Sequence, residues 1–174
     1  MPVNILAISG STRLQSTNHT LIHIIAELYA GTVNITHFEG LSTLPHFNPD
    51  LDNNTPPPAV TAFWEQLRAA DAVLICTPEY AMGVPGSLKN ALDWLVSSME
   101  LSKKPVALIT ASSMGEQAHA SLTGTLLVIE ANLPEASRLL ISFVKAKVKD
   151  GKITDESTLQ QVKSVMASLL YCIS

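Results

Sequence analysis

The sequence predicts an α/β fold in which a parallel sheet carries helices on both of its faces. Five short apolar or β-branched runs alternate with longer segments of helical periodicity, a pattern typical of consecutive βαβ units. Each run is apolar along its whole length rather than at every second residue, as expected for strands that are buried on both sides. Right-handed crossovers between such strands give a doubly wound sandwich, whose ligands bind beyond the carboxyl ends of the strands.

The predicted elements follow one another in a regular order. The five strands are "VNILAIS" (3–9), "VNITHF" (33–38), "AVLICT" (72–77), "PVALITA" (105–111) and "ASRLLI" (136–141). Apolar residues at helical spacing predict three of the helices: Leu21, Ile24, Ile25 and Leu28; then Leu88, Ala91, Leu92, Leu95 and Met99; and last Leu159, Val162, Val165, Met166 and Leu169. The first helix should stop at Gly31, and Ser87 can cap the second of the three.

Two further segments complete this division of the chain. The segment "AVTAFWEQLRAA" (59–70) is predicted to be another helix, which precedes the third strand. The proline-rich segment "LPHFNPDLDNNTPPP" (44–58) is predicted to be an ordered excursion over the surface, as a candidate lid or interface.

Composition limits the classes of function. A chain of 174 residues with 47% hydrophobic and 15% charged residues predicts a single domain, 1–174, with a sizeable core. A net charge of -4 argues against nucleic acid as a partner, and no apolar run is long enough for a membrane span, so we expect a soluble cytoplasmic protein. The two cysteines and five histidines show no metal-ligand spacing, so no metal site is expected.

The loop "GSTRLQSTN" joins the first predicted strand to the first helix. Its position at a helix N-terminus favours an anion, because free N–H groups and the positive end of the helix dipole meet there. Ser11, Ser16, Thr17 and Asn18 offer short neutral hydrogen-bonding groups, and Arg13 offers a planar cation, which together suit one phosphate monoester. The loop lacks both GxGxxG and GxxxxGK[ST]. Simple capping of the helix, with Arg13 in solvent, remains an equal alternative from this loop alone.

Two more loops follow the third and fourth predicted strands. In "TPEYAMGVPG" (77–86), prolines and glycines fix an irregular backbone that can face a flat heterocycle, with Tyr80 and Met82 packing on it. In "TASSMGEQAH" (110–119), N–H groups around Ser112, Ser113 and Gly115 can bind polar ring atoms or stabilise negative charge. All three loops should meet at one edge of the sheet.

The motifs "GSTRxxSxN", "TPEYxxxxPGxLKNALDWL", "SSMG" and "DGxIxDxxTL" resemble those of the NADPH-dependent FMN reductase family of flavodoxin-like proteins. The family includes quinone, chromate and azo-dye reductases, and the resemblance spans nearly the whole chain. It implies a flavodoxin-like three-layer sandwich with strand order 2-1-3-4-5. It also implies FMN as cofactor, with the phosphate at Ser11, Arg13, Ser16 and Asn18, and the ring at Pro78, Glu79, Tyr80, Ala81, Met82 and Gly83, with Ser113, Met114 and Gly115 on its other side.

By this resemblance the activity is electron transfer from NADPH or NADH, through the flavin N5, to a quinone or similar small acceptor in a ping-pong scheme. No catalytic acid or base is required, since the chemistry belongs to the cofactor. The resemblance further implies a homodimer or homotetramer.

Two alternatives remain open at this point. Family members usually carry Asn where Ala81 stands, and a Gly-Gly turn where this chain reads "EQAH". These departures motivate a flavin-poor binding or regulatory homologue. The other alternative is a flavodoxin-type carrier of single electrons.

Overall fold

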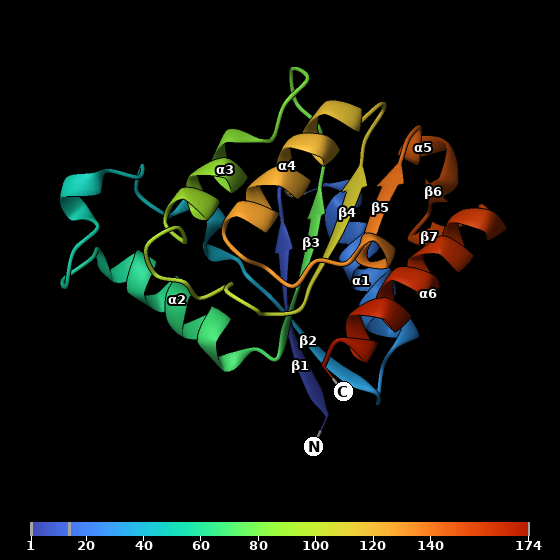
Figure 1. Ribbon diagram of the computed structural model, residues 1–174. Coiled ribbons are helices and arrows are strands. Elements are labelled where there is room, and N and C mark those ends of the chain that lie inside the picture. The colour runs from blue at the N-terminus through green and yellow to red at the C-terminus, as the bar shows by residue number, and fades with distance from the viewer. Residues whose placement is uncertain (1, 14, 174) are drawn as a thin grey trace.

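The computed structural model describes residues 2–13 and 15–173 and confirms the predicted sandwich (Figure 1). Five parallel strands form the sheet in the order β2-β1-β3-β4-β5. Their bounds are β1 Val3–Ser9, β2 Val33–His37, β3 Ala72–Thr77, β4 Val106–Ala111 and β5 Arg138–Ile141. The order reverses between β1 and β3, which is where doubly wound folds bind their ligands.

Helices cover both faces of this sheet. The helices are α1 Thr17–Leu28, α2 Pro58–Ala69, α3 Gly86–Asp93, α4 Glu116–Val128, α5 Val144–Lys147 and α6 Glu156–Tyr171, with 3-10 turns at Gly40–Ser42, Pro49–Leu51 and Glu135–Ser137. Figure 1 shows α2, α3 and α4 on one side of the sheet and α1 and α6 on the other. A short antiparallel pair, β6 Val148–Lys149 and β7 Lys152–Ile153, precedes α6.

Alternate residues of each strand supply the two halves of the core. In β1, Leu6 and Ile8 belong to the cluster that includes Phe63 of α2, whereas Ile5 belongs to the cluster that includes Leu21 of α1. Because both clusters are apolar, the continuous apolar runs of the sequence are explained by burial on both faces. The carboxyl ends of the strands, uppermost in Figure 1, are the edge at which the loops meet.

Several local predictions were wrong at their boundaries. The helix expected to run to Met99 ends at Asp93, and Met99 is exposed with a positive φ of 57°. Ser87 lies inside this helix, and Pro85 occupies the N-cap position. Leu28, expected on the apolar face of the first helix, is exposed at the end of α1. End positions of a periodic run are the weakest part of such predictions, because fraying and loop packing decide them.

The proline-rich excursion is ordered at its start, where α3 holds it. The side-chain amide of Asn90 accepts from the Phe47 N–H at 2.7 Å and donates to the Pro45 carbonyl at 3.0 Å. The indole N–H of Trp94 donates to the same carbonyl at 2.9 Å. Trp94 is 0% exposed, so it is a core residue.

Candidate functional site

The loop after β1 is held against the end of β3 by a close backbone approach. The Gly10 N–H donates to the Cys76 carbonyl at 2.8 Å. A Cβ at Gly10 would lie 2.1 Å from Thr77 Oγ1, so no larger residue fits there without movement. This glycine therefore brings the loop that follows β1 next to the loop that follows β3.

The N-terminus of α1 combines a serine cap with a first turn that carries no negative charge. Ser16 is the N-cap, and its hydroxyl oxygen accepts from the Asn18 N–H at 3.2 Å. The first turn of α1 contains no acidic residue, so nothing in that turn neutralises the positive end of the helix dipole. Ser16 therefore caps α1, as the alternative interpretation of this loop expects. This cap does not exclude an anion at the same end of the helix.

Asn18 ties α1 to the end of β4 and leaves one acceptor free. Its Nδ2 donates to the Ala111 carbonyl at 3.2 Å. The residue is almost fully buried, and its Oδ1 has no hydrogen-bond partner within the part of the chain that the structure describes. Buried acceptors are normally paired, so this oxygen fits a ligand that carries a hydroxyl or N–H donor.

Residues 80–83 form a two-residue hairpin turn at the end of the loop after β3. Tyr80 and Gly83 exchange backbone hydrogen bonds of 3.0 and 2.9 Å. The central residues Ala81 and Met82 have φ values of 49° and 58°, the left-handed region that a type I′ turn requires. Neither residue is Gly or Asn, so both positions are strained by about 1 kcal/mol or more each.

Tyr80 joins this turn to the loop after β1. Its hydroxyl lies 3.2 Å from Ser11 Oγ, and the Arg13 N–H donates to that same Oγ at 3.3 Å. The loop predicted to bind phosphate and the loop predicted to face a flat ring are therefore in direct contact.

Glu79 fastens the loop after β3 to the N-terminus of α4. Its carboxylate accepts from the Gly115 N–H at 3.3 Å and from the Ala118 N–H at 2.9 Å. Its own backbone N–H donates to Ser112 Oγ at 3.2 Å. The side chain expected to contact a bound ring thus caps a helix, and it occupies the Gly115 N–H that was expected to stabilise negative charge on the ring.

The loop after β5 completes the edge and was missed by the sequence analysis. Val144 and Phe143 donate their N–H groups to the carbonyls of Ser112 and Ser113, at 3.0 Å each. Phe143 has a φ of 54° and is 66% exposed. The rule that ligands gather after strand ends, extended to the fifth predicted strand, points to this loop.

These loops enclose a cavity of about 270 Å³ at the edge of the sheet. Its walls contain nine of the fourteen predicted site residues: Ser11, Arg13, Ser16, Thr17, Asn18, Pro78, Glu79, Tyr80 and Ser113. Ala111, Ser112, Val144 and Lys145 line it as well. The other five predicted residues, Ala81, Met82, Gly83, Met114 and Gly115, lie in the same loops outside this lining. Of these, Met82 is 73% exposed and Met114 55%.

The charges of this cavity favour an anion. Arg13 and Lys145 are its cations, and the one carboxylate in the lining, that of Glu79, is bonded to α4. Nearby Cys76 offers no nucleophile, because burial raises the pKa of its thiol far above the usual range. Over the described residues no cluster of His, Cys, Asp or Glu is suited to a metal ion.

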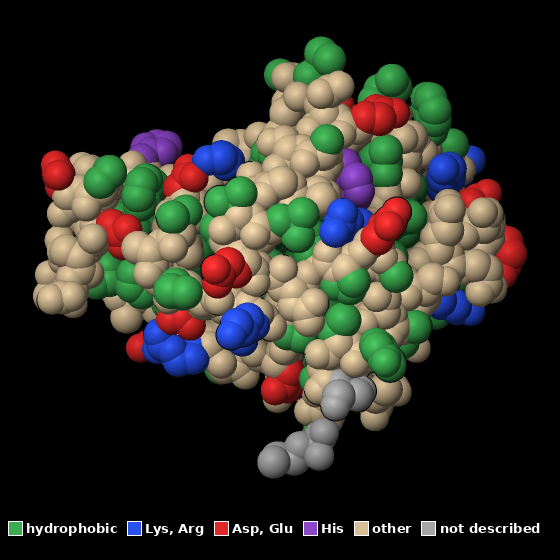
Figure 2. All heavy atoms as spheres, in the orientation of Figure 1, with side chains coloured by type: hydrophobic (Ala, Val, Ile, Leu, Met, Phe, Trp, Pro, Cys, Tyr) green, Lys and Arg blue, Asp and Glu red, His purple; other side chains and the backbone are tan. Residues whose placement is uncertain are grey.

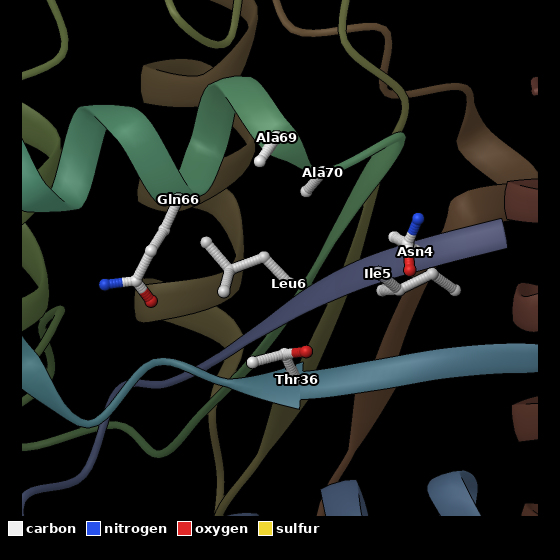
Figure 3. Close-up of a pocket in the computed structure, with 7 residues that line it drawn as sticks. All are labelled: Asn4, Ile5, Leu6, Thr36, Gln66, Ala69 and Ala70. Atoms are coloured by element: carbon white, nitrogen blue, oxygen red, sulfur yellow. The ribbon is translucent and has the colours of Figure 1, made fainter.

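A second cavity, of about 330 Å³, lies between α2 and the strands β1 and β2 (Figure 3). Its lining is Asn4, Ile5, Leu6, Thr36, Gln66, Ala69 and Ala70, none of them charged. It reaches the first half of β1 rather than its carboxyl end, so it is not part of the loop cluster.

Figure 2 shows acidic and basic side chains interspersed on the visible face, with no basic stripe.

Comparison with known proteins gives a consistent result. Residues 3–145 match the sequence profile of the family described as NADPH-dependent FMN reductase. A quinone reductase of Escherichia coli is 30% identical over 92% of this chain and 89% of its own length. An NADPH:quinone oxidoreductase of Arabidopsis thaliana is 33% identical over 96% and 90%, and an NAD(P)H-dependent FMN reductase of Pseudomonas aeruginosa is 32% identical over 96% and 93%.

Solved structures agree with this result. The flavoenzyme NAD(P)H:(acceptor) oxidoreductase of Paracoccus denitrificans superimposes with a TM-score of 0.79 and 27% identity, covering 98% of this chain and 97% of its own. An archaeal flavodoxin shares the fold, with a TM-score of 0.63 at 11% identity and coverage of 98% and 99%.

Within residues 2–13 and 15–173, no helix is long and apolar enough to cross a membrane.

Proposed function

The chain belongs to the NADPH-dependent FMN reductase family, and on that premise we propose that it binds FMN in the cavity between the loops after β1, β3 and β4. The observation that carries this proposal is the convergence of three separately predicted loops on one cationic cavity. FMN, when bound, supplies the hydride-accepting chemistry, and the protein supplies position, electrostatics and access.

Each part of FMN has a matching group in this cavity. Arg13 and the hydroxyl-rich start of α1 hold the phosphate, through charge-assisted and helix-terminal hydrogen bonds. The Oδ1 of Asn18, which has no hydrogen-bond partner among residues 2–13 and 15–173, accepts from a hydroxyl of the ribityl chain. Tyr80 and the backbone of Pro78 contact the ring, while the turn at Ala81 and Met82 borders it.

The electron acceptor is a small, flat, apolar molecule of the quinone class. Two of the relatives are named for quinones, and the loops at this edge carry the exposed side chains of Met82, Met114 and Phe143. Thioether and aromatic groups of this kind contact planar rings favourably. NADPH or NADH and the acceptor use this face in turn, which gives a ping-pong scheme without a side-chain acid or base.

A homodimer or homotetramer accounts for other exposed apolar groups. Val96 and Met99 are large apolar side chains on the surface, and association would bury them. Light scattering coupled to size-exclusion chromatography tests this state, and a monomer at micromolar concentration would contradict it.

The first test is a visible spectrum of the protein with added FMN, followed by NADPH under anaerobic conditions. A spectrum that shifts on binding and bleaches with NADPH supports the reductase. A bound flavin that NADPH leaves oxidised indicates the electron carrier, and no bound flavin indicates the regulatory homologue.

A pair of variants locates the site. Arg13→Ala should weaken FMN binding by about 10- to 100-fold, the usual range for one charge-assisted hydrogen-bond partner. Arg68→Ala removes an arginine of α2 that pairs with Glu100 instead, and should leave FMN affinity unchanged. Equal affinities of the two variants would refute the placement of the phosphate.

A further inference from the structure

A separate cavity of about 360 Å³ lies on the other side of the loop after β1, towards the end of β2. Arg13 and His19 line it from the loop after β1 and from α1, and His37, Phe38 and Leu41 line it from β2 and the turn beyond it. Hydroxyl groups of Ser9, Ser11, Thr12 and Ser42 complete the polar part of the wall. The cavity therefore combines cationic, hydrogen-bonding and apolar surfaces.

Two imidazole rings meet in its wall. The ring centroids of His19 and His37 are 4.7 Å apart at an interplanar angle of 52°. His19 Nε2 donates to the Ser11 carbonyl at 2.9 Å, so this nitrogen carries a proton. His37 Nε2 is buried and has no hydrogen-bond partner among the described residues. A buried ring nitrogen without a partner is the kind of group that a ligand satisfies.

The charges around this pair favour a negative ligand. Arg13 is the permanent cation, and Glu39, on the exposed turn after β2, is the one carboxylate of the lining. His23, one turn after His19 on α1, pairs with Glu27 and lies outside this lining. Burial, followed by the nearby His19, lowers the pKa of His37, while Glu39 raises it to a smaller extent. A bound anion would oppose the first two effects.

We propose that this cavity is a second ligand site, which binds a small organic anion with its acidic group at Arg13 and His37 and its apolar body against Phe38 and Leu41. The site lies on the other side of the loop from the flavin cavity and needs no flavin. Ser11 and Arg13 belong to the walls of both, so bound FMN should weaken binding of the anion by competing for Arg13. A carboxylate or a phosphate can serve as the acidic group, since both accept from guanidinium and imidazolium donors.

Benzoate is the probe for this site, tested by calorimetry on the full chain with and without added FMN. Benzyl alcohol lacks the charge and inorganic phosphate lacks the apolar body, so both should bind more weakly than benzoate. Affinity for benzoate should fall as the pH rises from about 5 to about 7, because protonated imidazole favours the anion and burial places the pKa of His37 below its ordinary value. His37→Gln should weaken binding at least about fivefold at the lower pH and abolish this pH dependence.

His23→Gln is the control, because it removes a neighbouring histidine, on α1, that does not line this cavity, and it should change benzoate affinity less than about twofold. A second readout uses the unmutated protein: in proton NMR, saturating benzoate should raise the pKa of His37. Absence of saturable binding, equal effects of His37→Gln and His23→Gln, or an unmoved His37 titration would each overturn the proposal. Flavin absorbance reports on the flavin cavity independently.

Discussion

Removing the carboxylate of Glu79 should destabilise the protein by about 2 kcal/mol, since a hydrogen bond to a charged group contributes about 1.5–3 kcal/mol. The carboxylate receives two N–H groups at the start of α4, of which the one from Ala118 is short at 2.9 Å and the one from Gly115 long at 3.3 Å. The longer bond and the partial exposure of the side chain keep the total below the sum of two full bonds, near the value of one. Glu79→Gln keeps one acceptor oxygen but loses the interaction with the helix dipole, so about 1 kcal/mol is expected.

Urea unfolding followed by far-ultraviolet circular dichroism measures both changes, provided that the m-value is unchanged. Glu116→Gln is the control, because Glu116 lies in the first turn of the same helix and is exposed. It should change the free energy of unfolding by no more than about 0.5 kcal/mol. If Glu79→Ala destabilises no more than Glu116→Gln, the role of Glu79 as a helix cap is refuted.

Four further changes test other parts of the structure. Ala81→Asn should stabilise the left-handed turn by about 0.5–1 kcal/mol in urea unfolding and tighten FMN binding, because Asn tolerates this backbone region. Gly10→Ala should destabilise by at least about 2 kcal/mol in the same assay, since its Cβ would overlap Thr77. Burial lowers the pKa of His119 below its unfolded value, so stability should fall as the pH drops from about 7 to about 5, and His119→Gln should flatten this dependence in thermal unfolding. In the native protein a thiol reagent should modify one cysteine of the two, because Cys76 is fully buried.

The strands and their layers could be predicted because burial on both faces leaves a direct trace in the sequence. "AVLICT" coincides with β3 at both ends, and the run 3–9 coincides with β1. Lys89 and Asp93, one turn apart in the sequence of α3, form an ion pair at 2.5 Å. Strand order carries no such trace in composition or periodicity. It was predicted only through the resemblance to a family.

The site was predictable in its loops but not in its contacts. Position after a strand identified three of the loops, and the same rule was not applied to the fifth strand, so Val144 and Lys145 were missed. That Glu79 caps α4 could not be inferred, because its partners are 36 and 39 positions further along the chain. The left-handed turn at Ala81 likewise has no signal in a sequence without Gly or Asn at that position.

The hydrogen bonds between loops explain why a flavin site can tolerate the departure at Ala81. Each loop at the edge is bonded to a neighbour: Ser11 approaches Tyr80, Glu79 receives N–H groups from α4, and the carbonyl of Ser112 receives the Val144 N–H. These bonded loops form a rim around the cavity. A ligand that enters it meets donors and acceptors that are already fixed, so binding costs little entropy for ordering the loops. The strain at Ala81 lies at the outer tip of this rim, beyond the cavity wall. Its effect should therefore appear as a modest change in the affinity for the ring, with the phosphate end of the site unaffected.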